Sequence, residues 1–388
     1  MPSLSPQEVL DLLSQLISFD TVSPEGKQYE DLVHFLKGWL EERGVSAKVE
    51  YVDDEYRSSH CPQGPKPLLF AWVGEGEPLL EFNGHYDVVP PGDGWEGNPF
   101  EPKVVGEYLV GRGATDMKGG VAAVAASLAE LSNWKGNKVQ AVFVPDEEVG
   151  GRCGTGYRVS KLKEKYEIPR RVVVAEPTDH NVWIGHKGVV WLRVEVPGKQ
   201  VHASTPWMGE NAFVKASALV LELNRALTDK FSKRYSKYEY SPEHPLTKFN
   251  AFNIGGVAYS TSNKENVVPG SFVFSVDVRV IPEEDEREVV EFVKEVIGDR
   301  AKVEVKLLEP GILNENSELA KLINEVWGEP LKVHKAASDM RYYRGYDVVT
   351  WGPGDHRESH TPNEKIKISE VVEFVGRYAR LAKLLAGG

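Results

Sequence analysis

The sequence predicts an α/β fold: a mostly parallel sheet with helices on both faces, interrupted by an inserted α+β domain with an antiparallel sheet. The first part of the chain alternates helical and apolar strand patterns, and this order returns after about residue 310. Between them, apolar and polar residues alternate along the strands. The first pattern is typical of parallel sheets, and the second of a sheet with one covered face. Because 388 residues exceed the usual size of one core, we expect one domain of residues 1–187 and 310–388 and another of residues 188–309.

Two amphipathic helices should open the chain, because apolar residues recur at helical spacing over residues 5–18 and 28–43. Residues 118–132, rich in Ala and Leu, form a third predicted helix. Short apolar runs between and after these helices indicate buried strands. These strands are expected at residues 67–73, 79–82, 139–144 and 171–175.

The middle of the chain has the two-residue period of a half-covered sheet. Strands are predicted at residues 188–196, 249–258, 271–280 and 302–307, and helices at 211–227 and 283–297. Beyond the insertion, the pattern predicts helices at 317–327 and 368–386 and a strand at 347–351. Residues 229–248 are polar, aromatic and basic, which indicates a solvated loop; a mobile excursion over the site is the alternative.

The composition argues against several classes of protein. The net charge of −12 disfavours nucleic acid and anionic membrane surfaces as partners. No apolar stretch approaches the length of a membrane span, and the N-terminal segment lacks the basic and apolar regions of a signal peptide. We therefore expect a cytoplasmic protein. Cys61 and Cys153 cannot form a disulfide framework; one bridge is possible, but two thiols are the expectation.

Five separated segments each end an apolar run with a residue that can bind a metal ion. Ligands of open α/β sheets gather beyond the carboxyl ends of the strands, so these residues are expected to meet. They are His85, Asp116, Glu147, Glu148, Glu176 and His360. Taken singly, each has an ordinary alternative: a polar turn, a helix cap or a solvated acidic loop. Together they favour a site for Zn²⁺, Mn²⁺ or Co²⁺, because these ions suit carboxylate and imidazole ligands.

Two pairs of neighbouring residues suggest how such a site would work. Asp87 lies two residues after His85 and shares its face of an extended chain, so its carboxylate can accept the second imidazole N–H. Glu147 and Glu148 point in opposite directions, so one can bind metal while the other accepts a proton. Hydrolysis at a metal requires both functions.

Nine motifs, in order, resemble the dizinc aminoacylase/carboxypeptidase family, which includes acetylornithine deacetylase, succinyl-diaminopimelate desuccinylase, glutamate carboxypeptidases and dipeptidases. The motifs are GHYDVVP, GRGATDMKGG, PDEEVGG, AEPTD, VHASTP, NVVPG, DVR, SDMRYY and SHTPNE. The resemblance implies a zinc-exopeptidase-like domain that holds two divalent ions per subunit: zinc, with cobalt or manganese as alternatives. The implied ligands are His85 and Glu176 at one ion, Glu148 and His360 at the other, and Asp116 bridging both. It also implies Glu147 as general base, Asp87 as the residue that orients His85, and a cis peptide after Asp116.

The resemblance implies that the inserted domain serves as a lid over the active site and also forms the interface of a homodimer. His202 would reach the active site of the partner subunit and help stabilise the oxyanion, and Asn266 and Arg279 would bind substrate. Arginine suits two-point capture of a carboxylate, although an ordinary strand ion pair with Asp277 is the alternative for Arg279. The further residues expected to line this pocket are Ser338, Asp339 and Arg341.

The expected reaction is hydrolysis of an N-acyl or peptide bond beside a free carboxylate. An N-acyl-amino-acid deacylase of the acetylornithine deacetylase or succinyl-diaminopimelate desuccinylase type is favoured, with a dipeptidase or carboxypeptidase as the alternative. A non-catalytic protein that binds amino-acid conjugates or a partner, and a structural protein with acidic surface clusters, are the remaining alternatives. Pro145 and Ala175 depart from the residues that many family members have before their ligands, which leaves the substrate subtype open.

Overall fold

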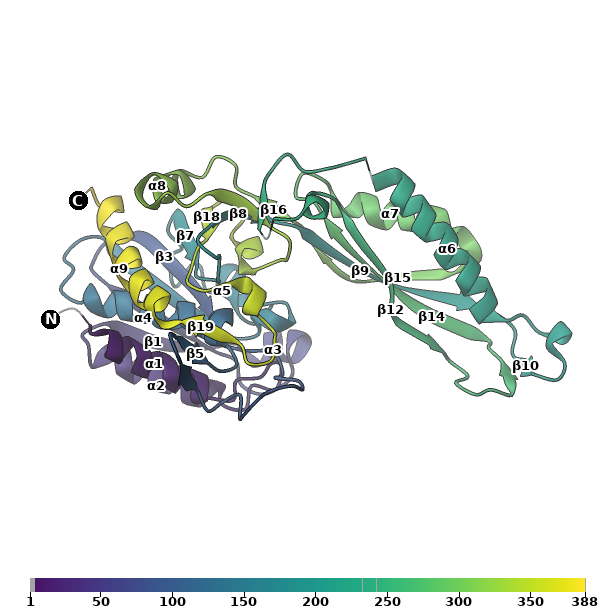
Figure 1. Ribbon diagram of the computed structural model, residues 1–388, viewed down its shortest axis with the longest axis horizontal. Helices are drawn as coiled ribbons and strands as arrows, with labels where there is room; N and C mark the ends of the chain where they lie inside the picture. Colours follow the sequence, from purple (N-terminus) through teal and green to yellow (C-terminus); the bar gives the residue numbers. More distant parts are fainter. Residues whose placement is uncertain (1–3, 232, 242, 388) are drawn as a thin grey trace. The chain divides into compact units, whose positions relative to one another are not determined.

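The computed structural model describes residues 4–231, 233–241 and 243–387, and its chain forms two compact units (Figure 1). The first unit comprises Met1–Ile184, Asn316–Leu331 and Tyr342–Gly388, and the second comprises Gly185–Glu315 and Lys332–Arg341. The second unit thus contains the range predicted for the inserted domain. Its role as a lid and dimerisation domain stays a prediction.

A mixed sheet forms the centre of the first unit, in the order β1-β2-β6-β3-β7-β18-β8. Its strands are β1 (Ser46–Tyr51), β2 (Pro67–Val73), β3 (Pro78–His85), β6 (Lys138–Val144), β7 (Arg171–Val174), β18 (Asp347–Thr350) and the start of β8 (Val182–His186). β3 runs parallel to β6 and β7, and β18 runs parallel to β7. β2 pairs antiparallel with both of its neighbours, β1 and β6. β2, β6 and β7 are largely buried on both sides, which is why their sequences are nearly continuous apolar runs, whereas β1 is partly exposed.

Helices cover both faces of this sheet, as the sequence predicts. They are α1 (Pro6–Ser18), α2 (Tyr29–Glu41), α4 (Gly119–Glu130), α5 (Thr155–Lys161), α8 (Glu318–Trp327) and α9 (Ile368–Leu385), whereas the short helix α3 (Asp54–His60) has no buried residue. On one face, Phe82 of β3 packs against Tyr378 of α9, and α9 packs on α4. On the other face, Phe70 and Val142 pack with Tyr157 of α5. A small sheet of β19 (Lys365–Lys367), β5 (Tyr108–Val110) and β4 (Lys103–Val105) lies in the same unit.

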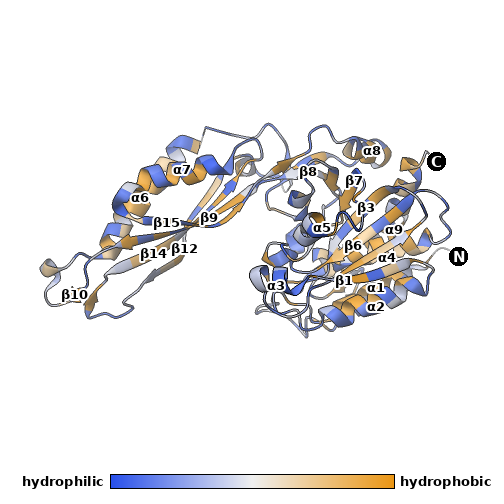
Figure 2. Ribbon diagram, turned by 180° about the vertical axis from the view of Figure 1, so that it is seen from behind, coloured by the Kyte–Doolittle hydropathy of each residue, from blue (hydrophilic) through white to orange (hydrophobic). Residues whose placement is uncertain are grey.

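The second unit is built on an antiparallel sheet in the order β12-β14-β9-β15. The strands are β9 (Gly188–Pro197), β12 (Ala251–Ser260), β14 (Ser271–Val280) and β15 (Lys302–Glu309). Helices α6 (Ala212–Phe231) and α7 (Glu286–Ile297) cover one face with apolar residues such as Leu223 and Val293, and carry polar residues elsewhere (Figure 2). Val194 and Val276 contribute from the sheet. The half-covered antiparallel sheet predicted from the two-residue period is therefore confirmed.

Short strands extend the second unit. They are β10 (Val201–His202) paired with β13 (Val267–Val268), β16 (Ile312–Leu313) paired with the end of β8, and β11 (Tyr240–Ser241) paired with β17 (Leu331–His334). The prediction of a solvated loop over residues 229–248 was wrong in part. Helix α6 continues to Phe231, Ser236 and Tyr240 are buried, and a 3₁₀ turn forms at Pro245–Lys248, while residues 232 and 242 lie outside the described residues.

The expectation of two thiols was also wrong, because Cys61 and Cys153 form a disulfide. Cys61 follows α3, and Cys153 lies in the turn between β6 and α5. A separation of 92 residues hides this proximity from the sequence. Among the described residues, no helix combines the length and apolar character needed to cross a membrane.

Candidate metal centre

Four of the predicted site residues, His85, Glu147, Glu148 and Glu176, follow neighbouring strands of one sheet, whereas His360 lies in the loop between the 3₁₀ turn His356–Glu358 and β19. His85 is the last residue of β3, and Glu176 comes two residues after β7. Glu147 and Glu148 open a 3₁₀ turn shortly after β6. Because β3, β6 and β7 are parallel neighbours, their carboxyl ends meet at one edge. Asp116 lies in the turn before α4. In the first turn of α4, glycine is required at Gly120 because a β-carbon there would lie 2.0 Å from the Ala175 carbonyl oxygen.

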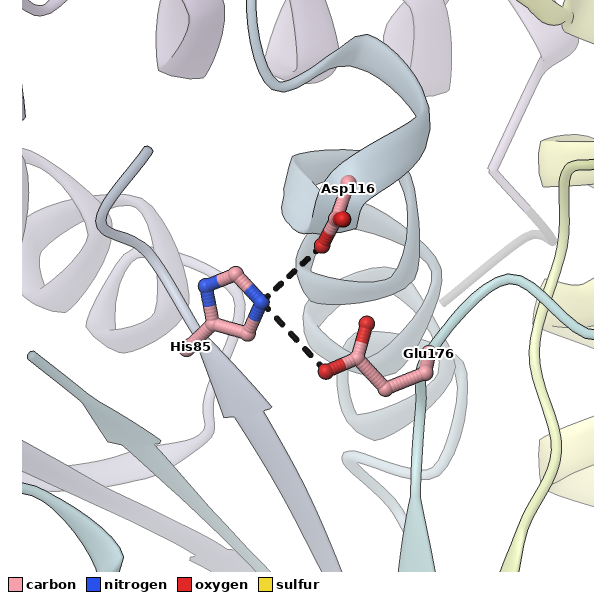
Figure 3. Close-up of side chains that lie close together, drawn as sticks. All are labelled: His85, Asp116 and Glu176. Carbon is pink, nitrogen blue, oxygen red and sulfur yellow. Dashed lines mark hydrogen bonds and ion pairs between the residues drawn. The ribbon is translucent and has the colours of Figure 1, made fainter. Parts of the chain in front are cut away.

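One group of possible ligands comprises His85, Asp116 and Glu176 (Figure 3). His85 Nε2 lies 3.1 Å from Asp116 Oδ1 and 3.4 Å from Glu176 Oε1. His85 Nδ1 lies 3.0 Å from the backbone carbonyl oxygen of Asp87, to which it donates in the tautomer that leaves Nε2 able to bind a metal. Burial opposes a charge on His85, but the carboxylates of Glu176, Asp116 and Asp87 raise its pKa well above the usual value. The group thus favours a cation.

A second group comprises Asp116, Glu148 and His360. His360 Nε2 lies 3.1 Å from Glu148 Oε2 and 3.4 Å from Asp116 Oδ2. Asp116 therefore offers one oxygen to each group. Burial raises the pKa of Glu148 to about 7, and the charge of Asp116 adds to this effect. Two imidazoles and three carboxylates are a donor set that fits two ions of the zinc type. The peptide bond after Asp116 is cis, as the resemblance implied.

Asp87 has a second contact that the sequence did not reveal. Its carboxylate lies 3.4 Å from His85 Nδ1, the predicted partner. In addition, its Oδ1 accepts the backbone N–H of Glu147 at 3.0 Å, and its Oδ2 accepts that of Glu148 at 3.2 Å. Asp87 is fully buried. It therefore connects the His85 strand to the turn that carries the two glutamates.

Glu364 is a further residue at the site, which the sequence reasoning missed although it ends the SHTPNE motif. It is fully buried, and its carboxylate accepts the backbone N–H groups of Thr115 at 2.8 Å and Asp116 at 2.9 Å. It also accepts the N–H of Gly113 at 3.1 Å and pairs with Arg112 at 2.5 Å. Glu364 thus fixes the Asp116 turn to the segment that follows His360.

The predicted substrate-binding residues belong to the second unit. The β10–β13 pair places His202 beside Asn266, whose carbonyl oxygen accepts the Ala203 N–H at 3.0 Å. Arg279 pairs with Asp277 at 2.9 and 3.1 Å, the strand ion pair considered as its alternative role. The remaining predicted residues, Ser338 and Arg341, are buried, and Arg341 Nη2 lies 3.8 Å from Asp339 Oδ1. Their roles in substrate binding stay predictions.

Comparison with known proteins agrees with this geometry. Residues 82–384 match the family model described as peptidase family M20/M25/M40. The chain is 29% identical to a succinyl-diaminopimelate desuccinylase of Nitratiruptor sp., with 94% of this chain and 96% of the relative covered. Its fold is similar to that of a tripeptidase from Staphylococcus aureus, with a TM-score of 0.76 and 19% identity. The match covers 99% of this chain and 100% of the tripeptidase.

A dinuclear metal-binding peptidase of the M20 family from Bacillus subtilis also shares the fold, with a TM-score of 0.67 and 15% identity over 98% of both chains. The family match covers most of the chain and includes all five proposed ligands. The predicted family and the predicted class of enzyme are confirmed. This chain belongs to peptidase family M20/M25/M40 and is a metallohydrolase.

Proposed function

We propose that the protein hydrolyses the amide bond of an N-acyl amino acid, in a homodimer, with two zinc ions per subunit. The observation that carries this proposal is the sharing of Asp116 between two groups of possible ligands, one with His85 and Glu176 and the other with Glu148 and His360. Cobalt or manganese are alternative metals, because they accept the same donors. A cytoplasmic location is part of the proposal.

Two bound ions would supply Lewis acidity, polarising the scissile carbonyl group and lowering the pKa of water. Glu147 takes a proton from the attacking water as the water oxygen bonds to the carbonyl carbon. The C–N bond then breaks, and Glu147 returns the proton to the leaving amine. Asp87 holds Glu147 for this task through the backbone hydrogen bond at 3.0 Å. In the proposed dimer, His202 of the partner subunit donates to the oxyanion.

A basic pocket in the second unit supports a substrate with more than one carboxylate. The cavity, of about 400 Å³, is lined by Lys187, Arg279 and Lys335, among others. Lys187 is 2% exposed, and within the described residues no carboxylate lies within 4.0 Å of its ammonium. Burial, helped by the charge of Arg279, lowers the pKa of Lys187 to about 8. A carboxylate on the ligand would supply the missing counter-charge, which favours an acidic acyl group such as succinyl over a neutral one.

Two measurements test this proposal. Glu147→Gln should retain two metal ions per chain yet lose at least about 100-fold in kcat, because it removes the general base. A panel of N-succinyl amino acids, N-acetyl amino acids and dipeptides should show the highest kcat/KM for a succinyl substrate. Near-normal turnover by Glu147→Gln would exclude its role as base, and a preference for dipeptides would establish the alternative, a dipeptidase.

A further inference from the structure

A short segment of the first unit, residues 61–66, is linked at both ends to the turn that carries Glu147 and Glu148. At one end, Lys66 Nζ lies 2.9 Å from each carboxylate oxygen of Asp146, the residue before Glu147. At the other end, Cys61 is joined to Cys153 by the disulfide. These contacts enclose the turn between residues 146 and 153. The four residues between Cys61 and Lys66 are exposed, so the segment meets the turn mainly through its ends.

The link at Lys66 is a buried charge pair. The Lys66 side chain is 0% exposed and that of Asp146 is 3% exposed. Lys66 also donates to the Pro24 carbonyl oxygen at 2.7 Å, and the Tyr29 hydroxyl donates to Asp146 Oδ1 at 2.9 Å. A buried ammonium requires a counter-ion, and so does a buried carboxylate, so each fixes the position of the other. Lys66 does not take part in the proposed chemistry, so the proposed function does not explain why this charge pair is buried.

Asp146 determines the direction of the turn. Its backbone is left-handed, with φ 63° and ψ 22°, a conformation that residues with a β-carbon rarely adopt. Its carbonyl oxygen accepts the N–H of Gly151 at 2.7 Å, which closes the turn. Directly after it, the N–H groups of Glu147 and Glu148 donate to Asp87. An anchored Asp146 side chain therefore controls the orientation of both glutamates.

We propose that Lys66 is a positioning residue for hydrolysis and that residues 61–66 form a brace that holds the Glu147–Glu148 turn in its active orientation. This inference rests on the proposed roles of the two glutamates. A shift of about 1 Å in a reacting group can cost ~100-fold in rate, so loss of the ammonium should act on turnover more than on substrate binding.

The test compares Lys66→Met with a matched control, Arg158→Met, in the purified, metal-loaded protein. Arg158 also forms a fully buried ion pair in the first unit, with Glu81 at 2.7 Å, but Arg158 is not assigned to the site. Both variants should lower the melting temperature. Well below that temperature, Lys66→Met should lose ~10- to 100-fold in kcat with KM and metal content unchanged, whereas Arg158→Met should stay within about twofold of wild type.

A milder variant, Tyr29→Phe, removes one hydrogen bond from Asp146 and keeps the charge pair. It should lower kcat by about threefold or more, and it decides the question if Lys66→Met does not fold. If Lys66→Met folds and has the kcat of the wild type, the brace is overturned. If Lys66→Met does not fold, a wild-type kcat in Tyr29→Phe overturns it. An equal loss in Arg158→Met also overturns it. If Glu147→Gln is inactive in the same assay, the proposed function stands even though the brace fails; if Glu147→Gln is active, the proposed function itself fails.

Discussion

At the scale of single residues, the site depends on carboxylates that bind backbone rather than metal. Asp87 holds the N–H groups of Glu147 and Glu148, and Glu364 holds the Asp116 turn. Each is buried and satisfied by several donors, so each fixes the backbone of proposed ligands from outside the metal groups. Hydrogen bonds of this kind determine how well the ligands are oriented before a metal ion binds.

Glu364→Gln should weaken metal binding by about 10- to 100-fold, because the neutral amide forms no ion pair with Arg112 and turns its NH₂ group toward backbone N–H donors. The change is measured by competition with a chelator of known affinity. Glu358→Gln is the control, because Glu358 lies in the same segment but is partly exposed, with its nearest ion-pair contact to Lys365 at 3.8 Å. Equal affinity in wild type and Glu364→Gln would show that the Asp116 turn holds its shape without this carboxylate.

A second residue-scale prediction concerns pH. Hydrogen bonds that His180 donates to the carboxylates of Glu329 and Glu370 raise its pKa to about 10. Because this pKa is higher in the folded protein than in the unfolded chain, protonated His180 stabilises the fold. The stabilisation is complete at pH values below about 6.5, the pKa in the unfolded chain, and is lost as pH rises through about 10. The side chain is 49% exposed, so screening limits the contribution to below ~1 kcal/mol. His180→Asn should therefore lower the melting temperature more at about pH 6 than at about pH 10.5. An equal shift at both pH values would contradict the proposed charge interaction.

At the scale of elements, periodicity predicted the long pieces well and the short ones poorly. The strands over residues 67–73 and 271–280 have the predicted bounds, and the long helices agree within a few residues. Elements such as β4 and α3 were missed, because three to seven residues carry too little periodicity to distinguish them from loops. Strand order explained why His85, Glu148 and Glu176 meet, but not why Asp116 and His360 join them. Contacts such as Asp87 to Glu147 and Glu364 to Asp116 join residues 60 and 248 apart, and no local pattern encodes them.

The disulfide between α3 and the turn after β6 yields a prediction about stability. Closing a loop of this length restricts the unfolded chain by about 4–5 kcal/mol in the chain-entropy model, for a separation of 92 residues. The Cys61→Ser/Cys153→Ser double variant should melt about 10 °C below wild type in calorimetry. Reduced wild-type protein should match the variant. A shift below ~2 °C would mean that the bridge does not restrict the unfolded state.

At the scale of the whole molecule, the second unit presents features that the proposed homodimer would cover. Strand β12 is an edge of its sheet, and Val257 and Tyr259 on it are 46% and 45% exposed. Exposed apolar edges tend to pair with another chain. Tyr259→Lys should therefore shift the protein to a monomer in sedimentation, because a charge opposes pairing at that edge. Val104→Lys, on an exposed strand of the first unit, is the matched control and should remain a dimer. A monomeric wild-type protein with full activity would refute the dimer.

The placement of His360 and Glu364 has a consequence for biosynthesis. Chains leave the ribosome from the N-terminus, and their domains fold as they emerge. His85, Asp116 and Glu176 precede the insertion, so all three are synthesised before it. The other group needs His360, and the Asp116 turn needs Glu364, both from the last segment of the first unit. On the proposed assignment, a growing polypeptide is therefore inert toward peptides around it until the segment with His360 and Glu364 has been synthesised.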